Sequence, residues 1–255
     1  MEEKNLSAVI ITYNEEQFLA LALESVAFAD EIVVVDSFSA DRTVEIARQF
    51  TEKVYQRKFD DFSSQRNYSL GLAEGRWVLV IDADEIVTAG LKNEILAITN
   101  SSAENSAYAI PRDNVFMGKA MRRAGLGNDH VVRLFPRTVK YRNRVHEVPD
   151  TGELQVKNLK EKLKHITYKG YEEMVRKTYR YSALRAIDMY EKGYRPTLFK
   201  MMFKPAFRFI KHYIFQGGFM EGKRGFIFSY MTSMDVFMRI SQTWRLRAGE
   251  RIQGH

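Results

Sequence analysis

An apolar strand leads directly into an acid-bearing turn three times within the first 85 residues, and this repetition limits the fold more than any other feature. The apolar runs cover residues 8–13, 32–35 and 77–81, and an acid follows each of them within two residues. Apolar residues at helical spacing between the runs predict βαβ units, and hence a mostly parallel sheet covered by helices on both faces. Ligands bind beyond the carboxyl ends of the strands in such sheets, so the three turns predict one site.

The remaining pattern divides the chain into an α/β domain and a helical extension. Helices are predicted near residues 19–29, 44–50, 63–74 and 91–98, with short strands near residues 54–55, 108–110, 131–135 and 139–141. No repeat or low-complexity linker interrupts these elements, so we predict one continuous domain over residues 1–168. The extension, residues 169–255, is predicted to hold helices near 171–192, 199–215 and 226–244, the second of them kinked by Pro205.

The positive charge of the chain is concentrated in the extension. The net charge is +7, and residues 195–251 hold 11 Lys and Arg against 3 acids, or +8, which leaves −1 for the rest. Nine of the 17 phenylalanines lie in the same stretch. A basic and aromatic surface favours peripheral contact with an anionic membrane over nucleic acid, although helical packing against the domain also explains the aromatic residues.

The sequence predicts a cytoplasmic protein. There is no cysteine, which excludes disulfides and thiolate metal sites. The first residues are acidic and lead directly into a strand, so they lack the features of a signal peptide. No run approaches the roughly 18 uninterrupted apolar residues of a spanning helix. We expect the protein to act at the inner face of the cytoplasmic membrane.

The third turn contains two carboxylates, Asp82 and Asp84, directly after a strand that is too apolar to be exposed. A divalent ion that bridges two phosphates commonly takes only one or two carboxylates, since phosphates and waters complete its shell. On an extended segment the two side chains point the same way. The pair therefore predicts a site for Mg²⁺ or Mn²⁺; the alternative is two acids in a solvated turn.

These motifs, in this order and spacing, resemble the family 2 inverting glycosyltransferases. The resemblance rests on residues 9–15, 35–43, Arg66-Asn67 with the glycines that follow, and the Asp-x-Asp motif at 82–84. It implies the GT-A fold, a Rossmann-like nucleotide-binding sandwich, with the nucleotide-sugar half at about residues 6–100 and the acceptor half at about 101–168. A nucleotidyltransferase is disfavoured because residues 8–16 contain no glycine for a triphosphate loop.

The resemblance implies roles for individual residues. It places Thr12 and Glu15 along the nucleotide, Asp36 at the base edge, Arg66 at the diphosphate or the base pocket, and Asp82 at the ribose or the metal. Asp84, with Asp82, is implied as the metal ligand. The donor is expected to be a nucleotide-diphosphate sugar, and UDP is the expected nucleotide.

A narrower resemblance covers the second half. Residues 131–135, 144–147, 165–168 and 217–226 are similar to the branch of the family that builds lipopolysaccharide inner cores, typified by a β-1,4-glucosyltransferase. Glu221 departs from that branch, which often has Asp at this position. A lipid-linked glycan is therefore the expected acceptor, with polyprenyl phosphate or another surface polysaccharide as the alternative.

Inversion needs a base that removes the proton of the acceptor hydroxyl. Glu147 is the predicted base because it follows the metal motif in a segment expected to fold over the sheet edge, and Asp113 and Asp129 are the alternatives. Arg66 or Arg133 is expected to stabilise charge on the diphosphate. His146 and His165 are candidates for the metal shell or for structural hydrogen bonds. The competing hypothesis from another class is a nonenzymatic module that binds nucleic acid through its basic tail, but it leaves the three acid-bearing turns without a role.

Overall fold

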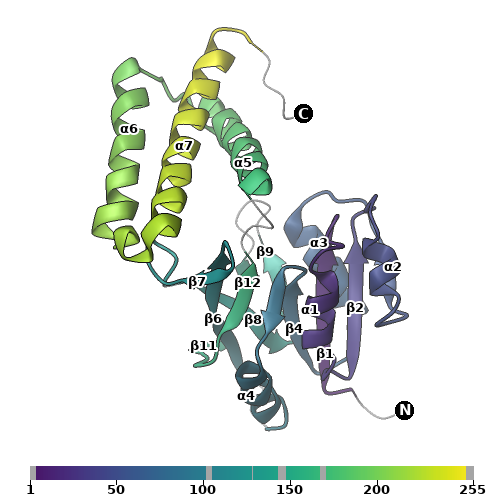
Figure 1. The fold of residues 1–255 in the computed structure, drawn as a ribbon. Coiled ribbons are helices and arrows are strands. Elements are labelled where there is room, and N and C mark those ends of the chain that lie inside the picture. Colours follow the sequence, from purple (N-terminus) through teal and green to yellow (C-terminus); the bar gives the residue numbers. More distant parts are fainter. Residues whose placement is uncertain (1–3, 102–104, 128, 143–147, 167–170, 251–255) are drawn as a thin grey trace. The chain divides into compact units, whose positions relative to one another are not determined.

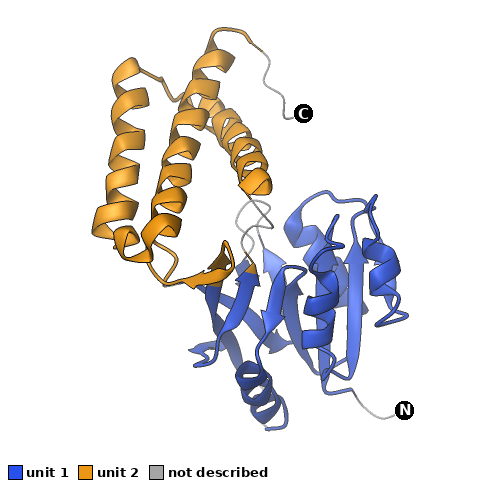
Figure 2. Cartoon of the chain, in the orientation of Figure 1, with its two compact units in different colours: residues 1–113, 129–165 blue, residues 114–128, 166–255 orange. Residues whose placement is uncertain are grey.

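The structure is a computed structural model, and it describes residues 4–101, 105–127, 129–142, 148–166 and 171–250 (Figure 1). The chain forms two compact units. Unit 1 comprises Met1–Asp113 and Asp129–His165, and unit 2 comprises Asn114–Asn128 and Ile166–His255 (Figure 2). The predicted domain limit at residue 168 falls close to the last of these boundaries. The segment 114–128, predicted to belong to the first domain, clusters with the helical unit.

The centre of unit 1 is a mixed sheet whose first half is parallel. Its parallel strands lie in the order β3-β2-β1-β4, and their bounds are β1 (Leu6–Thr12), β2 (Glu31–Asp36), β3 (Val54–Gln56) and β4 (Trp77–Asp82). Antiparallel strands β8 (His130–Pro136) and β6 (Ser106–Phe116) continue the sheet beyond β4. Thr12 pairs with Asp36, and Ile11 pairs with Asp82. The prediction that the acid-bearing turns share one edge is confirmed.

Helices cover both faces of this sheet, which explains why its strands are apolar without alternation. They are α1 (Leu19–Ser25), α2 (Thr43–Ala47), α3 (Phe62–Leu72) and α4 (Ala89–Thr99). Along β1, Ala8 and Ile10 belong to the core cluster that includes α1 and α4, whereas Val9 belongs to the cluster that includes Leu70 of α3. Successive strand residues point to opposite faces, so a sheet buried on both sides needs apolar residues throughout.

Several short strands after β4 have no clear apolar pattern, and the sequence did not predict them. They are β5 (Glu85–Val87), β7 (Lys119–Met121), β10 (Val148–Asp150), β11 (Gln155–Asn158) and β12 (Leu163–Ile166), while β9 (Lys140–Arg142) lies one residue beyond its predicted place. All four residues of β11 are exposed. Such strands are held by pairing with neighbours, as β11 is by β6, and period-two patterning arises only where one face is buried.

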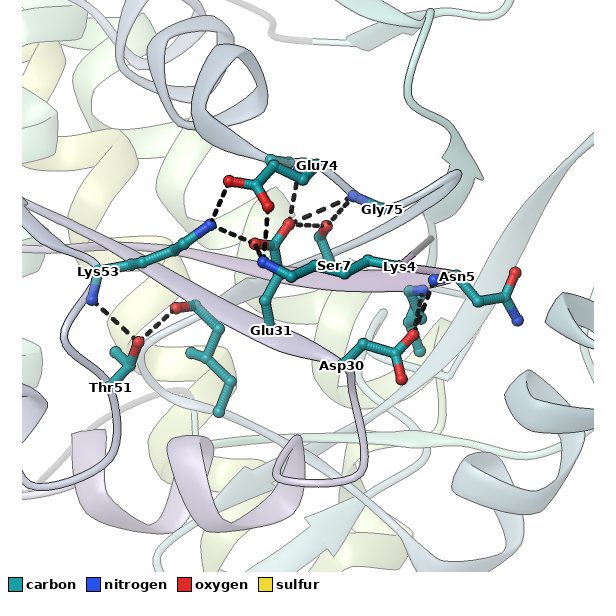
Figure 3. A network of polar contacts seen from close by, with 12 residues as sticks. Lys4, Asn5, Ser7, Asp30, Glu31, Thr51, Lys53, Glu74 and Gly75 are labelled. Atoms are coloured by element: carbon teal, nitrogen blue, oxygen red, sulfur yellow. Dashed lines mark hydrogen bonds and ion pairs between the residues drawn. The ribbon is translucent and has the colours of Figure 1, made fainter. Parts of the chain in front are cut away.

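The amino ends of the parallel strands are held together by a polar network around Glu31 (Figure 3). Its carboxylate accepts hydrogen bonds from Lys53 Nζ at 2.6 Å, Lys4 Nζ at 3.0 Å and the Glu74 backbone N–H at 2.5 Å, as well as from the Ser7 hydroxyl. Although burial disfavours the charge, these partners, Lys53 foremost, lower the pKa of Glu31 to about 2. The network lies at the edge of the sheet opposite the acid-bearing turns and stabilises the fold.

Unit 2 is built on three long helices, and the predicted helical extension is confirmed. They are α5 (Tyr171–Glu191), α6 (Leu198–Ile210) and α7 (Gly222–Arg247), with a π-helical turn (Lys211–Phe215) after α6 and a 3₁₀ turn (Gly218–Glu221) before α7. Helix α7 packs against both α5 and α6 and lies between them (Figure 1). Helix α6 runs through Pro205, and the irregular turn follows at Lys211 rather than at the proline.

The segment 114–128 is tied to the helices by backbone hydrogen bonds. Glu221 accepts the N–H groups of Arg122 and Arg123 at 3.0 and 3.1 Å, and Ala124 N–H donates to the carbonyl of Gln216 at 2.9 Å. A carboxylate at position 221 therefore has a structural role in unit 2. This role accounts for an acid within the glycine-rich stretch 217–226.

Candidate active site

The turns after β1 and β2 are joined to each other by hydrogen bonds. Asn14 N–H donates to Ser39 Oγ, and Glu15 N–H donates to Thr43 Oγ1, both at 2.8 Å. Asn14 and Phe38 have positive φ values of 53° and 61°. A positive φ is strained for residues other than glycine, and such strain tends to persist at ligand sites. The two turns thus form one fixed wall of the site.

Asp36 and Thr12 offer polar atoms at this wall. Asp36 is fully buried and accepts bonds from Ser39 N–H at 2.9 Å, from the Ser39 hydroxyl and from Gln56 Nε2 at 3.2 Å. An ionised carboxylate has about four acceptor positions, so one remains for a ligand. The buried Thr12 hydroxyl has no partner among the described residues. Buried polar groups are nearly always satisfied, so this hydroxyl fits a group that a ligand supplies.

Asp82 is held between two guanidinium groups. Arg66, from α3, donates through Nη2 to Asp82 Oδ1 at 2.8 Å, and Arg133, from β8, donates to Asp82 Oδ2. Arg133 also donates to Glu85 Oε1 at 2.8 Å. The guanidinium of Arg66 lies 5.4 Å from the centre of the Tyr141 ring. Both arginines are almost fully buried, and their positions are therefore fixed before any ligand binds.

The charges of this cluster stabilise one another. Burial opposes ionisation of Asp82, but the charges of Arg133 and Arg66 outweigh it and hold the pKa of Asp82 well below its usual range. Burial likewise opposes the charge of Arg133, and Asp82 and Glu85 raise its pKa. The charges of the two guanidinium groups are matched within the cluster by the carboxylates of Asp82 and Glu85. Guanidinium groups match phosphate oxygens in geometry, so the cluster fits a diphosphate ligand.

The metal motif separates into two different environments. Both oxygens of Asp82 accept from guanidinium groups, which leaves Asp82 poorly suited to a cation. Asp84 instead faces His165, whose Nε2 lies 3.7 Å from Asp84 Oδ2. Carboxylate and imidazole ligands suit a divalent ion whose shell is completed by phosphates and waters. Within the described residues no group of three acids or histidines is placed to hold a metal ion.

Two of the three candidate bases lie in ion pairs. Asp113 forms an ion pair with Lys162 at 2.7 Å, and Asp129 pairs with Arg112 at 2.8 Å. Both carboxylates are therefore engaged within the protein. Glu147, the predicted base, and its neighbour His146 lie outside the described residues.

Glu85 and Arg112 belong to the site, but sequence reasoning gave them no role. Glu85 is fully buried, accepts from Arg112 Nη1 at 3.3 Å and receives the Asp82 backbone N–H at 3.0 Å. It thereby fixes the turn that carries Asp82 and Asp84. The available signal was an acid directly after the Asp-x-Asp motif and before two apolar residues, a position from which it can point back into the protein.

The sequence matches a known family of enzymes. The sequence model described as glycosyl transferase family 2 matches residues 7–179. A lipopolysaccharide core biosynthesis glycosyltransferase, LpsC of Rhizobium meliloti (strain 1021), is 27% identical over 252 residues, covering 92% of each chain. An uncharacterized glycosyltransferase of Rickettsia typhi, RT0209, is 27% identical over 263 residues, covering 97% of this chain and 89% of its own.

Among solved structures, TarS of S. aureus, residues 1–349 in complex with UDP-GlcNAc, covers 97% of this chain and 93% of its own. The TM-score is 0.48 and the sequence identity 16%. The sheet topology, together with the family match, confirms the predicted fold class: a mostly parallel GT-A sandwich with a C-terminal helical extension.

Proposed function

This chain belongs to glycosyl transferase family 2, and on that premise we propose that it moves a hexose from a UDP-sugar to a lipid-linked glycan of the lipopolysaccharide core type, with inversion at the anomeric carbon. The observation that carries this proposal is the shared strand edge, where Thr12, Asp36 and Asp82 lie on neighbouring strands beside two buried arginines. A nucleotide needs polar atoms for base and ribose, and a diphosphate needs cations. This edge offers both within one site.

Different residues are proposed to bind the nucleoside and the diphosphate of the donor. Thr12, Glu15 and Asp36 are proposed to hold the base and ribose, since the Thr12 hydroxyl and one acceptor position of Asp36 remain for a ligand. Arg66 and Arg133 are proposed to bind the diphosphate in bidentate fashion. Asp82 holds both guanidinium groups in place, so no reorganisation is needed when the leaving diphosphate gains charge.

A divalent cation, Mg²⁺ or Mn²⁺, fits beside Asp84 and His165. The separation of 3.7 Å between Asp84 Oδ2 and His165 Nε2 allows both atoms to face one ion. Bound there, the cation would supply positive charge to the leaving diphosphate. Asp82 is assigned to holding the arginines rather than to direct ligation, because both of its oxygens are occupied.

Glu147 is proposed as the base that takes the proton of the acceptor hydroxyl as its oxygen attacks the anomeric carbon. The alternatives, Asp113 and Asp129, are engaged in ion pairs with Lys162 and Arg112. Breaking either pair during turnover would take from Lys162 or Arg112 one of its carboxylate partners. A carboxylate outside these pairs is therefore favoured.

The acceptor assignment draws on the relative whose name refers to lipopolysaccharide core biosynthesis and on the surface of α6. Large apolar side chains of α6 are exposed, at 66% for Phe199, 56% for Phe203 and 63% for Phe207. Lys200 and Lys204 follow at four-residue spacing on the adjoining stripe. Such a helix suits an anionic membrane surface. No helix in the described part of the chain has the length and apolar character needed to span a membrane.

Mass spectrometry of reaction products tests the proposal. The protein is incubated with a UDP-hexose, a divalent cation and one of two acceptors: truncated lipopolysaccharide core or polyprenyl phosphate. We expect the core glycan to gain one hexose. Product on polyprenyl phosphate alone would overturn the acceptor assignment and retain the transferase, whereas no product with any donor and acceptor would count against the transfer itself.

A further inference from the structure

Unit 2 contains a cavity of about 450 Å³ between its helices. Residues of α5, α6, α7 and the π-helical turn line it, and they include Arg185, Arg208, His212, Asp235 and Arg239. All lining residues belong to unit 2, whereas the residues described above for the donor and metal belong to unit 1. The cavity is therefore a separate feature that the proposed transfer does not use. Its volume falls within the range of pockets that bind small molecules.

The charges that line the cavity are unbalanced. Three arginines face it with a single carboxylate, which gives a formal charge of +2 when His212 is neutral. Asp235 is already paired with Arg185, with Oδ2 and Nη1 2.9 Å apart. The guanidinium of Arg239 has no hydrogen bond or ion pair among the described residues, although it is partly buried. Asp235 is thus the single carboxylate beside three guanidinium groups, and it is paired with Arg185 and not with Arg239.

His212 does not balance this charge. Its Nδ1 lies 2.6 Å from the carbonyl oxygen of Ala124, so Nδ1 carries the proton and donates it. The other ring nitrogen, Nε2, then accepts from Arg208 Nη1 at 3.3 Å. Burial foremost, with the charges of Arg208 and Lys211, lowers the pKa of His212. The ring is a neutral acceptor that orients Arg208 toward the cavity.

The unbalanced charge raises the free energy of the unliganded cavity. Burial lowers the pKa of Arg239; Asp235 opposes this shift, and the charges of Arg208 and Arg185 add to it. A partly buried cation among like charges is unfavourable unless an anion compensates it. Anions with several oxygens match converging guanidinium groups best, because each guanidinium presents a planar fork of donors.

Part of the cavity wall is apolar. Met174 of α5 and Phe228 and Met231 of α7 line it, and each is at most 8% exposed. A wall of this kind can pack against the apolar part of a ligand. From the charge and the wall together, we propose that the cavity binds a phosphate group carried by a larger, partly apolar molecule, with Arg208 and Arg239 as its ligands.

Isothermal titration calorimetry in a phosphate-free chloride buffer tests this site. The probes are inorganic phosphate, the soluble short-chain lipid dihexanoyl phosphatidic acid and the uncharged dihexanoylglycerol. The chain variants are Arg239→Gln and Arg208→Gln, with Arg180→Gln as the matched control, because Arg180 is exposed on α5 and does not line the cavity. We expect saturable binding of the phosphatidate, weakened by about ten-fold or more in the first two variants and unchanged in the control.

The probes separate the two sources of phosphate. Tighter binding of the phosphatidate than of inorganic phosphate supports a phosphate carried by a partly apolar molecule, and equal binding of the two overturns that part of the proposal in favour of a free phosphate site. Absence of saturable binding, or binding that Arg66→Gln weakens while Arg239→Gln does not, overturns the proposal, since the latter result would place the anion at the sheet edge. Asp84→Ala should leave this binding unchanged, so loss of transfer and loss of the cavity site can be told apart.

Thermal unfolding distinguishes a role of Arg239 in ligand binding from a purely structural role. Removal of an uncompensated charge should leave Tm unchanged or raise it in phosphate-free buffer, while wild type alone should gain Tm when phosphatidate is added. A fall in Tm of Arg239→Gln without ligand, with an equal ligand effect in both proteins, would mean that Arg239 only supports the helices, and would contradict the proposal.

Discussion

At the scale of single residues, the two acids of the Asp-x-Asp motif have different partners. Asp82 is held by two buried guanidinium groups, whereas Asp84 faces an imidazole. Their one-residue spacing predicted a shared site, with Asp82 at the ribose or the metal, and did not predict that Asp82 is held by arginines. The separation arises from Arg66 and Arg133, which are 16 and 51 residues away from Asp82 in the chain. Pairings over such distances leave no local pattern.

Neutralising the two acids should therefore affect different properties. Asp84→Ala is expected to reduce metal-dependent transfer by at least about 100-fold with little change in stability. Asp82→Asn is expected to lower the free energy of unfolding by about 3 kcal/mol, because it leaves buried cations without their partner. Transfer assays with added Mn²⁺ and urea unfolding measure the two effects. Glu153→Ala, at an exposed position, is the control, and equal loss of stability in both aspartate variants would contradict the separation.

Glu31 predicts a pH dependence of stability. Its pKa is about 2 in the folded protein against a usual value of 4.5, so its contribution is fully present above pH 4.5 and is lost as the pH falls toward 2. The shift corresponds to about 3 kcal/mol. Denaturant unfolding from pH 7 to pH 2 should show this loss in wild type. In Glu31→Gln stability should be lower at neutral pH and flatter across the window; an unchanged profile would contradict the assignment.

Among the elements, the ends of the parallel strands could be predicted from the sequence, whereas the partners of the segment 114–128 could not. Strands β1, β2 and β4 are buried on both faces, so their apolar runs and terminal acids are visible locally. The segment 114–128 has no such pattern, and it joins the helical unit through Glu221 and Gln216. Its assignment to unit 2 depends on contacts made about 100 residues away, which sequence periodicity does not encode.

The turn before β4 needs glycine for space. A Cβ at Gly75 would lie 2.6 Å from Ser7 Oγ and 2.7 Å from Ser7 N. Gly75 N–H also donates to Ser7 Oγ at 2.7 Å. Gly75→Ala should therefore destabilise the protein by about 2 kcal/mol, as measured by urea unfolding. Gly71→Ala is the control, since nothing lies within 4 Å of a Cβ at that position; equal stability of the two variants would argue against the close approach.

The exposed aromatic residues of helix α6 lead us to predict binding to anionic vesicles. A double change of Phe203 and Phe207 to Ser should reduce cosedimentation with phosphatidylglycerol vesicles several-fold while leaving Tm unchanged, because both rings are exposed. Leu184→Ser, at an exposed position of α5, serves as the control. Vesicle binding that survives the double change would show that the aromatic residues of α6 are not the contact.

In the molecule as a whole, the proposed donor site belongs to unit 1, and unit 2 is basic, aromatic and helical. The fold class and the shared edge of β1, β2 and β4 could be predicted from patterns within the first 100 residues, because the apolar pattern of each of these elements depends on its own burial. The helical unit could be predicted from its composition and helical spacing. Its cavity could not, because Arg185, Arg208 and Arg239 come from three different helices. Only the packed structure brings them together.

A crystal structure with a UDP-sugar and Mn²⁺ is the sharpest test of the claim that the three strand ends form one donor site. The predicted result places the uracil and ribose beside Thr12 and Asp36, the diphosphate on Arg66 and Arg133, and the ion against Asp84. The claim is contradicted if the nucleotide lies away from the carboxyl ends of β1, β2 and β4, or if the diphosphate contacts neither arginine.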